Sequence, residues 1–245
     1  MAFGDSITLG EDGTTTLGAF DLAHFLRPDY PTIVLVGREY PTVLRGLLAA
    51  RYTTQQLTMV NAGRQAERLS DPDTLRRFTD VVASRAYDVV LLMEGTNDIY
   101  GGTGGNPLGI PPAITNLRQM VRDARSRGVR VFLATVPPQN PAGRRGALGY
   151  QVVPLLNAEI RTLALTEGVP LVDVYDAFNG NLGLLAGDGL HPNADGFARI
   201  AAKFYDVVQE RLEAPRLGPV PVLVSGVEDA WRSDRTSVFA DSARQ

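Results

Sequence analysis

The sequence predicts a three-layer α/β/α sandwich in which a five-stranded parallel sheet lies between two layers of helices. Short apolar runs rich in β-branched residues alternate along the chain with helical patterns. The links between them are short, as right-handed crossovers in a parallel sheet require. The chain has 245 residues, of which 44% are hydrophobic and 21% charged, so it can bury a sizeable core.

Five apolar runs are typical of parallel strands that are buried on both faces, because they lack the polar alternation of half-exposed strands. The first precedes the turn Gly4-Asp5-Ser6, and polar or small residues also follow the second, third and fourth runs. The predicted strands are residues 1–3, 57–60, 88–93, 129–134 and 169–174.

Five segments carry a helical pattern and alternate with the predicted strands. Asp71 followed by proline is typical of a helix start, because proline is well tolerated at the first helical position. Gly128 and Gly168 are typical of helix ends, where glycine adopts a left-handed backbone. The predicted helices are residues 40–52, 72–85, 112–127, 152–167 and 192–212.

The pattern predicts one domain over residues 1–213, with two segments outside the alternation. Residues 11–38 form an insertion between the first turn and the first helix, and loops of this length are usually functional or disordered. Its apolar content predicts that it packs over the ligand site expected at the carboxyl ends of the strands. Residues 214–245 form a proline-containing, polar tail that we expect to lie outside the core. The apolar residues of the insertion include Phe20, Leu22, Phe25 and Leu26.

Composition excludes several classes of function. The net charge is −3 with no long basic run, which argues against a nucleic-acid partner. Without cysteine there are no disulfides, thiolate nucleophiles or cysteine zinc sites. No apolar run approaches the roughly 18–20 residues of a membrane span, so we expect no stable membrane insertion. Two histidines and the lack of a phosphate-binding loop argue against a metal or phosphate enzyme, so no metal and no cofactor are expected.

The two histidines limit the choice of a general base. His191 has Asp188 three residues upstream in a glycine-containing loop. This spacing lets the aspartate accept a hydrogen bond from one ring nitrogen, which leaves the other nitrogen ready to take a proton. Taken alone, the pair is equally compatible with a capping histidine and a loop aspartate. His24 lies in the insertion, and we expect it to be a solvated side chain.

Ser6 follows the first predicted strand directly, in a turn begun by Gly4. A serine hydroxyl is a poor nucleophile unless a base removes its proton. Aspartate and serine are common turn residues, so the tripeptide alone is a weak signal. Its position at the carboxyl end of a parallel strand, where such sheets bind ligands, favours a nucleophile.

Acyl transfer also needs hydrogen-bond donors for the oxyanion that develops on the carbonyl. Gly63 can bring a bare backbone N–H close to a substrate, and Asn97 can offer its side-chain amide. The backbone N–H of Ser6 would be a third donor. In isolation, Gly63 can equally be a turn glycine, and Asn97-Asp98 can equally be a helix start.

Four sequence blocks together resemble the GDSL, or SGNH, hydrolase family, from Met1 to about Arg211. The resemblance implies a flavodoxin-like fold, with Ser6 as nucleophile and Asp188 and His191 completing the triad. It also implies an oxyanion hole of Ser6, Gly63 and Asn97. The short first strand, the insertion and the tail depart from the family pattern. The blocks are residues 2–8, 61–63, 95–98 and 188–192.

The resemblance implies a metal-independent serine esterase that hydrolyses carboxylic esters through an acyl-enzyme. The expected partner is a small-molecule ester. Short acyl chains are predicted, because the residues around the blocks are small or polar. A carbohydrate O-deacetylase using the same triad is one alternative. A non-catalytic binding module on the same fold is an alternative of another class.

Only residues 1–3 precede the first turn, whereas a buried strand usually has about five residues. We therefore expect that upstream residues, including an export signal, have been removed. The resemblance adds the expectation of a bacterial protein exported to the periplasm or the medium.

Overall fold

The computed structural model describes residues 1–15, 32–84, 86–102 and 104–213. Within these residues, five parallel strands form one sheet in the order β4-β1-β5-β6-β7. Counted along the chain, the parallel strands stand in the order 2-1-3-4-5, which is a doubly wound sheet with its switch point between β1 and β5. The strands are β1 (Ala2–Gly4), β4 (Asn61–Gly63), β5 (Val89–Met93), β6 (Arg130–Ala134) and β7 (Leu171–Val172).

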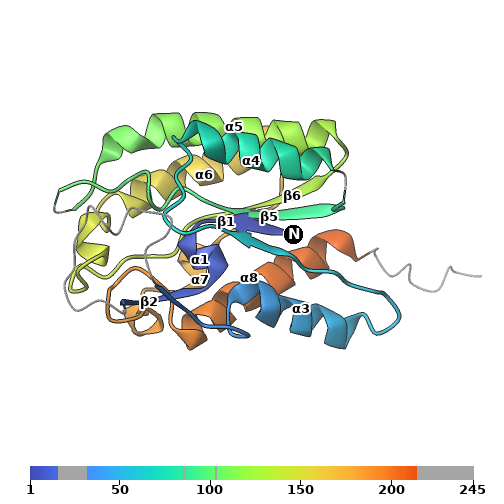
Figure 1. Ribbon diagram of the computed structural model, residues 1–245, viewed down its shortest axis with the longest axis horizontal. Coiled ribbons are helices and arrows are strands. Elements are labelled where there is room, and N and C mark those ends of the chain that lie inside the picture. Colours follow the sequence, from blue (N-terminus) through green and yellow to red (C-terminus); the bar gives the residue numbers. More distant parts are fainter. Residues whose placement is uncertain (16–31, 85, 103, 214–245) are drawn as a thin grey trace, which may run out of the picture. The chain divides into compact units, whose positions relative to one another are not determined.

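Helices cover both faces of the sheet, which confirms the predicted sandwich (Figure 1). One layer contains α4 (Pro72–Ala83), α5 (Ile110–Ser126) and α6 (Val153–Glu167), and the other contains α3 (Tyr40–Arg51) and α8 (Ala194–Leu212). Two short helices follow strands β1 and β7, namely α1 (Ser6–Leu9) and α7 (Val174–Ala177). Single 3₁₀ turns occupy Pro107–Gly109, Gly146–Leu148 and Leu182–Leu184.

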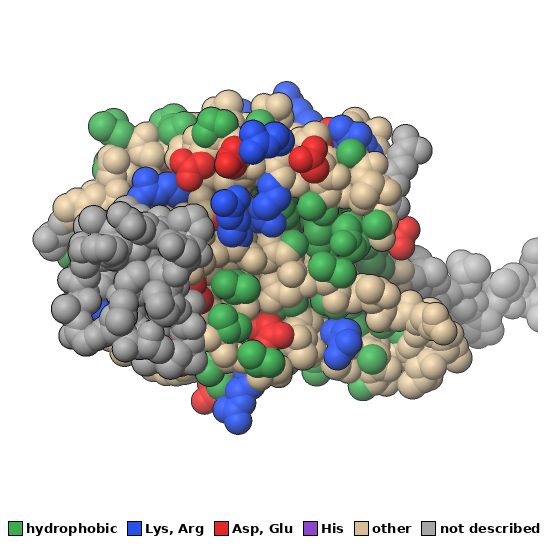
Figure 2. Space-filling model, in the orientation of Figure 1, with side chains coloured by type: hydrophobic (Ala, Val, Ile, Leu, Met, Phe, Trp, Pro, Cys, Tyr) green, Lys and Arg blue, Asp and Glu red, His purple; other side chains and the backbone are tan. Residues whose placement is uncertain are grey.

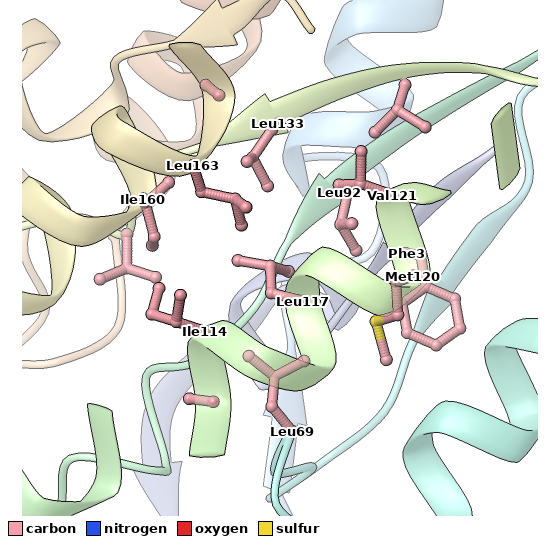
Figure 3. Packing of buried hydrophobic residues seen from close by; sticks show 14 of the residues in the cluster. Phe3, Leu69, Leu92, Ile114, Leu117, Met120, Val121, Leu133, Ile160 and Leu163 are labelled. Carbon is pink, nitrogen blue, oxygen red and sulfur yellow. The ribbon is translucent and has the colours of Figure 1, made fainter. Parts of the chain in front are cut away.

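The core is divided by the sheet into two apolar clusters. On one side, α5 packs on β6 and contacts its neighbours α4 and α6, and its apolar face is buried (Figure 3). On the other side, the ring of Tyr40 stacks on Phe204 at a centroid distance of 5.2 Å and joins α3 to α8. Burial of each large apolar side chain contributes about 1.5–3 kcal/mol, so these clusters hold the layers on the sheet. The contacts in Figure 3 involve Leu117, Met120, Leu133, Ile160 and Leu163.

Some element boundaries differ from the prediction. The run 57–60 precedes the strand: the Ala2 N–H donates to the Val60 carbonyl at 2.8 Å, but the ladder with β1 covers Asn61–Gly63. The last predicted strand shortens to Leu171–Val172, because Asp173 accepts a hydrogen bond from the Asp176 N–H and begins α7.

Two predicted helix starts also differ in detail. Helix α5 begins at Ile110 rather than at residue 112, because its first turn accommodates two prolines. Asp71 does precede α4, but its side chain makes no capping hydrogen bond. The helix start there depends on Pro72 rather than on a side-chain cap.

The two ends of the predicted insertion pair with each other. Strand β2 (Glu11–Thr15) runs antiparallel to β3 (Thr32–Val34), with Glu11 opposite Val34. The predictions for the insertion's apolar residues and for His24 lie outside the described residues. The predicted tail, 214–245, also lies outside them, and its separation from the core stays a prediction. Among the described helices, none has the length and apolar character needed to cross a bilayer.

The outer surface of α4 and α5 carries charges of both signs side by side (Figure 2). Arg76 contacts Asp73 at 2.6 Å on α4, and Arg122 of α5 contacts Glu167 of α6 at 2.8 Å. Surface ion pairs of this kind contribute little to stability, because water and salt screen them. This surface is therefore a solvated helix face, and the chemically distinctive residues lie at the carboxyl edge of the sheet.

Candidate active site

The first turn after β1 presents Ser6 at the carboxyl edge of the sheet. Asp5 caps helix α1 by accepting a hydrogen bond from the Ile7 N–H at 2.9 Å. A Cβ at Gly4 would lie only 2.4 Å from the Met93 carbonyl oxygen of the neighbouring strand. Glycine is therefore required for β1 to run this close to β5 and then turn directly into α1.

Ser6, His191 and Asp188 form a continuous chain of hydrogen-bonding contacts. Ser6 Oγ lies 2.9 Å from His191 Nε2, and His191 Nδ1 lies 2.7 Å from Asp188 Oδ2. The other Asp188 oxygen accepts hydrogen bonds from the N–H groups of Leu190 and His191. Burial opposes the charge of Asp188, but its bonds with His191 hold the pKa of this carboxyl below its usual range. The structure thus brings together the three residues that sequence analysis selected as a triad, in a geometry suited to proton transfer.

Asn97 lies buried in the loop after β5, with its side chain held in one orientation. Its Nδ2 donates to the Glu67 carbonyl at 2.9 Å. The neighbouring Asp98 carboxylate accepts hydrogen bonds from the N–H groups of Leu69 and Ser70, both at 2.8 Å. Together these bonds tie the loop after β4 to the loop after β5. Because an amide nitrogen carries two hydrogens, the bond to Glu67 orients the group and uses only one of them.

Gly63 occupies a different environment from the one predicted. Its N–H donates to Asn61 Oδ1 at 2.9 Å, and a Cβ at this position would lie 2.1 Å from the Leu9 backbone nitrogen. The glycine is therefore explained by the close packing of β4 on α1. Its predicted role as an oxyanion donor requires that the N–H first leave Asn61, so this geometry gives that role no support.

Ala66 is a residue that sequence analysis missed. Its φ is +53°, a left-handed backbone that residues with a Cβ rarely adopt. It precedes Glu67, whose carbonyl holds Asn97, and its own N–H donates to no acceptor within the described part of the chain. No sequence signal marks this position, because alanine carries no hint of a left-handed conformation. A strained residue with an available N–H beside Asn97 is a candidate donor at the site.

Two charged residues beside His191 were also missed. The fully buried carboxylate of Glu11, from β2, approaches His191 Nε2 to 3.4 Å. The buried guanidinium of Arg145 lies 3.3 Å from His191 Nδ1, 3.5 Å from Asp188 Oδ2 and 3.9 Å from Glu11 Oε2. Burial lowers the pKa of Arg145, while its acidic neighbours oppose that change. Neither residue belongs to a recognisable motif, so only the folded chain reveals their positions.

A pair of buried acids follows β1 and β5, next to the turn that carries Ser6. Gly4 pairs with Met93 in the ladder between β1 and β5, so Asp5 and Glu94 leave the sheet side by side. Burial raises the pKa of Asp5 to about 7, although the hydrogen bond from Ile7 opposes this. Burial and the charge of Asp5 raise the pKa of Glu94 well above its usual range. At neutral pH the two acids therefore do not both carry a full negative charge.

Comparison with known sequences finds one protein family over most of the chain. The sequence model of the GDSL-like lipase/acylhydrolase family matches residues 2–199. A multidomain esterase from Ruminococcus flavefaciens is 25% identical over 138 residues, which is 55% of this chain and 17% of that relative. The chain therefore matches only a small part of the length of this multidomain relative.

Solved structures with the same fold cover most of the chain. The carbohydrate acetylesterase Est24 from Sinorhizobium meliloti has a TM-score of 0.63 at 18% identity, and the match covers 85% of this chain and 97% of Est24. LAE5, an alpha/beta hydrolase enzyme from the metagenome of Lake Arreo, has a TM-score of 0.61 at 27% identity. This match covers 84% of this chain and 92% of LAE5. At 18% identity, the likeness to Est24 is evidence of a shared fold alone.

The raised pKa of Asp5 makes a prediction for stability. In the unfolded chain an aspartate loses its proton near pH 4, whereas folded Asp5 keeps it up to about pH 7. Between these values the folded state binds more protons, so the free energy of unfolding falls as the pH rises. Asp5→Asn keeps the cap but removes this loss. We expect the free energy of unfolding of the variant, relative to that of the wild type, to rise as the pH increases from 4 to 7, by on the order of a few kcal/mol in total.

Urea unfolding of wild type and Asp5→Asn at pH 5 and pH 8 measures this difference. The exposed acid Asp206 on α8 supplies the matched control, since Asp206→Asn should leave the pH dependence unchanged. A stability difference that is equal at both pH values would show that Asp5 does not hold a proton in the folded protein.

Proposed function

The chain belongs to the GDSL-like lipase/acylhydrolase family, and on this basis we propose that it is a serine esterase that hydrolyses carboxylic esters through an acyl-enzyme on Ser6. The observation that carries the proposal is the chain of contacts from Ser6 Oγ through His191 to Asp188, with distances of 2.9 Å and 2.7 Å. A serine, a histidine and a carboxylate in this order are the parts that acyl transfer by a hydroxyl nucleophile requires.

The first half of the reaction acylates Ser6. His191 Nε2 takes the hydroxyl proton as Oγ attacks the ester carbonyl carbon. Asp188 accepts a hydrogen bond from Nδ1, which keeps the correct tautomer and stabilises the imidazolium that forms. The imidazolium then gives its proton to the leaving alcohol as the ester C–O bond breaks. In the second half, water replaces the alcohol and His191 repeats both transfers, releasing the carboxylic acid.

The oxyanion is held by donors from the ends of three parallel strands. Ser6 begins α1, where the first N–H groups of a helix have no acceptor within it. Asn97 contributes the second hydrogen of an oriented amide. Ala66 contributes its backbone N–H, and its left-handed strain is consistent with a residue held in place for function. Gly63 is the weaker candidate for this third donor because of its bond to Asn61.

A sugar acetate is a second candidate substrate for the same triad. This candidate is suggested by the name of the structural relative Est24, a carbohydrate acetylesterase, while the likeness itself is evidence of the fold alone. Removal of an acetyl group from a sugar hydroxyl is the same chemistry as hydrolysis of a short-chain ester, with a larger alcohol part. A substrate panel that includes both aryl and sugar acetates therefore separates the two candidates.

The nucleophile is tested by Ser6→Ala. We expect a folded protein whose esterase rate on p-nitrophenyl acetate is lower by at least about 10³-fold, because no other hydroxyl replaces Oγ. The exposed serine at the end of α5 gives the control, and Ser126→Ala should retain the wild-type rate. Near wild-type turnover in purified, folded Ser6→Ala would rule out the proposed mechanism. A wild-type protein without ester hydrolysis would favour a binding module.

Acyl-chain preference is the second test. Each buried CH₂ contributes about 0.8 kcal/mol, so long acyl chains gain only where a long apolar groove receives them. We expect kcat/KM to be highest for acyl groups of roughly two to six carbons, measured with p-nitrophenyl esters from acetate to palmitate. A maximum at ten or more carbons would contradict this. The residues around the sequence blocks are small or polar: Thr8, Gly10, Thr96, Gly101, Gly102, Gly104 and Gly105.

A further inference from the structure

We propose that Glu11 is a second catalytic carboxylate, which stabilises protonated His191 at Nε2, and that Arg145 is a positioning cation that balances it. The inference rests on the proposed function, since it assigns His191 the role of general base. It extends that mechanism by placing the imidazole between two carboxylates, one at each ring nitrogen. Asp188 contacts Nδ1 at 2.7 Å, and Glu11 approaches Nε2 to 3.4 Å.

Strand β2 packs along the histidine–aspartate pair. Glu11 and Gly13 are two residues apart on this strand, whose pairing with β3 is irregular between Glu11 and Thr15. Glu11 approaches His191, and a Cβ at Gly13 would lie 2.3 Å from Asp188 Cγ. Only glycine allows the strand to come this close, and its φ of +74° also favours glycine. Asp12 lies between them in sequence and is the neighbouring carboxylate of the same strand.

Acidic groups approach the histidine at both ring nitrogens. Asp188 lies 2.7 Å from Nδ1 and Glu11 lies 3.4 Å from Nε2, while Arg145 lies within 4 Å of both carboxylates. When the Ser6 proton arrives at Nε2, both carboxylates attract the positive charge of the imidazolium. Because the side chains of Glu11, Arg145 and His191 are buried, solvent screens these interactions weakly.

Other titratable groups also face this cluster. Asp5 interacts electrostatically with the histidine from the first turn. Burial raises the pKa of its carboxyl to about 7, so its charge changes near neutral pH. Tyr100 faces Asp188, Arg145 and Glu11, and burial raises its pKa well above the usual range, so it stays uncharged. Arg144 lies beside Arg145 and adds a second positive charge at a greater distance from the histidine. A pH profile of the site must therefore be compared with that of Asp5→Asn.

The proposed step conserves protons and electron pairs. Ser6 Oγ bonds to the carbonyl carbon while its proton moves to Nε2, and the Nε2–H then donates to a Glu11 oxygen as well as to the departing oxygen. The ester C–O bond breaks, its electron pair stays on the alcohol oxygen, and that oxygen takes the proton from Nε2. Glu11 remains a carboxylate throughout and lowers the barrier by stabilising the intermediate charge.

The test compares two substitutions that remove opposite charges. Glu11→Gln should lower kcat about 10- to 10²-fold and move the acid limb of the kcat/KM profile to lower pH, because the imidazolium loses a stabilising charge. Arg145→Gln should move the same limb to higher pH, because a repelling charge is removed. Asp12→Asn removes the adjacent carboxylate of β2 and should change neither quantity.

A purely structural role would not produce shifts of opposite sign. The proposal is overturned if Glu11→Gln keeps the wild-type kcat and acid limb, or if both substitutions move the limb in the same direction. Glu11→Asp retains the charge and should keep the limb near its wild-type position. If Arg145→Gln does not fold, the comparison of Glu11→Gln with Glu11→Asp decides alone, and equal profiles for those two would overturn the proposal. Wild-type activity in Ser6→Ala would instead refute the underlying esterase mechanism.

Discussion

The contact between Ser6 Oγ and His191 Nε2 joins residues that are 185 positions apart, so it depends on the fold of the whole domain. Ser6 follows β1, the second strand in the sheet order, whereas His191 lies in the loop just before α8, the last described helix. In a doubly wound parallel sheet the carboxyl ends of all strands lie at the same edge, and this brings the two loops together there. The apolar clusters on both faces hold this edge rigid, because α5, α6 and α8 are anchored along their length.

This site concentrates acidic groups where water does not reach. Asp5, Glu11, Glu94 and Asp188 are all buried close to the turn that carries Ser6, and such groups are costly to bury unless they are paired, hydrogen-bonded or protonated. Each of these solutions occurs here: Asp188 bonds to His191, Arg145 approaches Glu11, and Asp5 retains a proton to about pH 7. In the proposed mechanism these acidic groups favour a transient positive charge on the imidazole.

Periodicity and residue scarcity made much of the fold and site predictable. The alternation of apolar runs and helical patterns predicted a parallel sheet between two layers of helices. The presence of only two histidines directed attention to His191. The match over residues 2–199 confirms the resemblance that four short blocks suggested. In these cases the information is local, because a strand, a cap or a motif is encoded by neighbouring residues.

The features that escaped prediction depend on tertiary contacts. Strand β4 begins at Asn61 because its ladder with β1 sets the register, which the apolar run 57–60 does not encode. Gly63 is a glycine because α1 approaches it closely, and the left-handed Ala66 lies between residues that suggest no such conformation. Glu11 and Arg145 meet at His191 from distant segments, so neither carries a sequence signal of its own.

The central claim is that His191 activates Ser6 for attack, and covalent trapping tests it most directly. Incubation with a fluorophosphonate followed by mass spectrometry of the digested protein should place one phosphonyl group per chain on the peptide that contains Ser6. The same treatment of folded His191→Ala should give little or no adduct, because the hydroxyl has lost its base. An adduct on another residue, or equal labelling of Ser6 in the two proteins, would contradict the account.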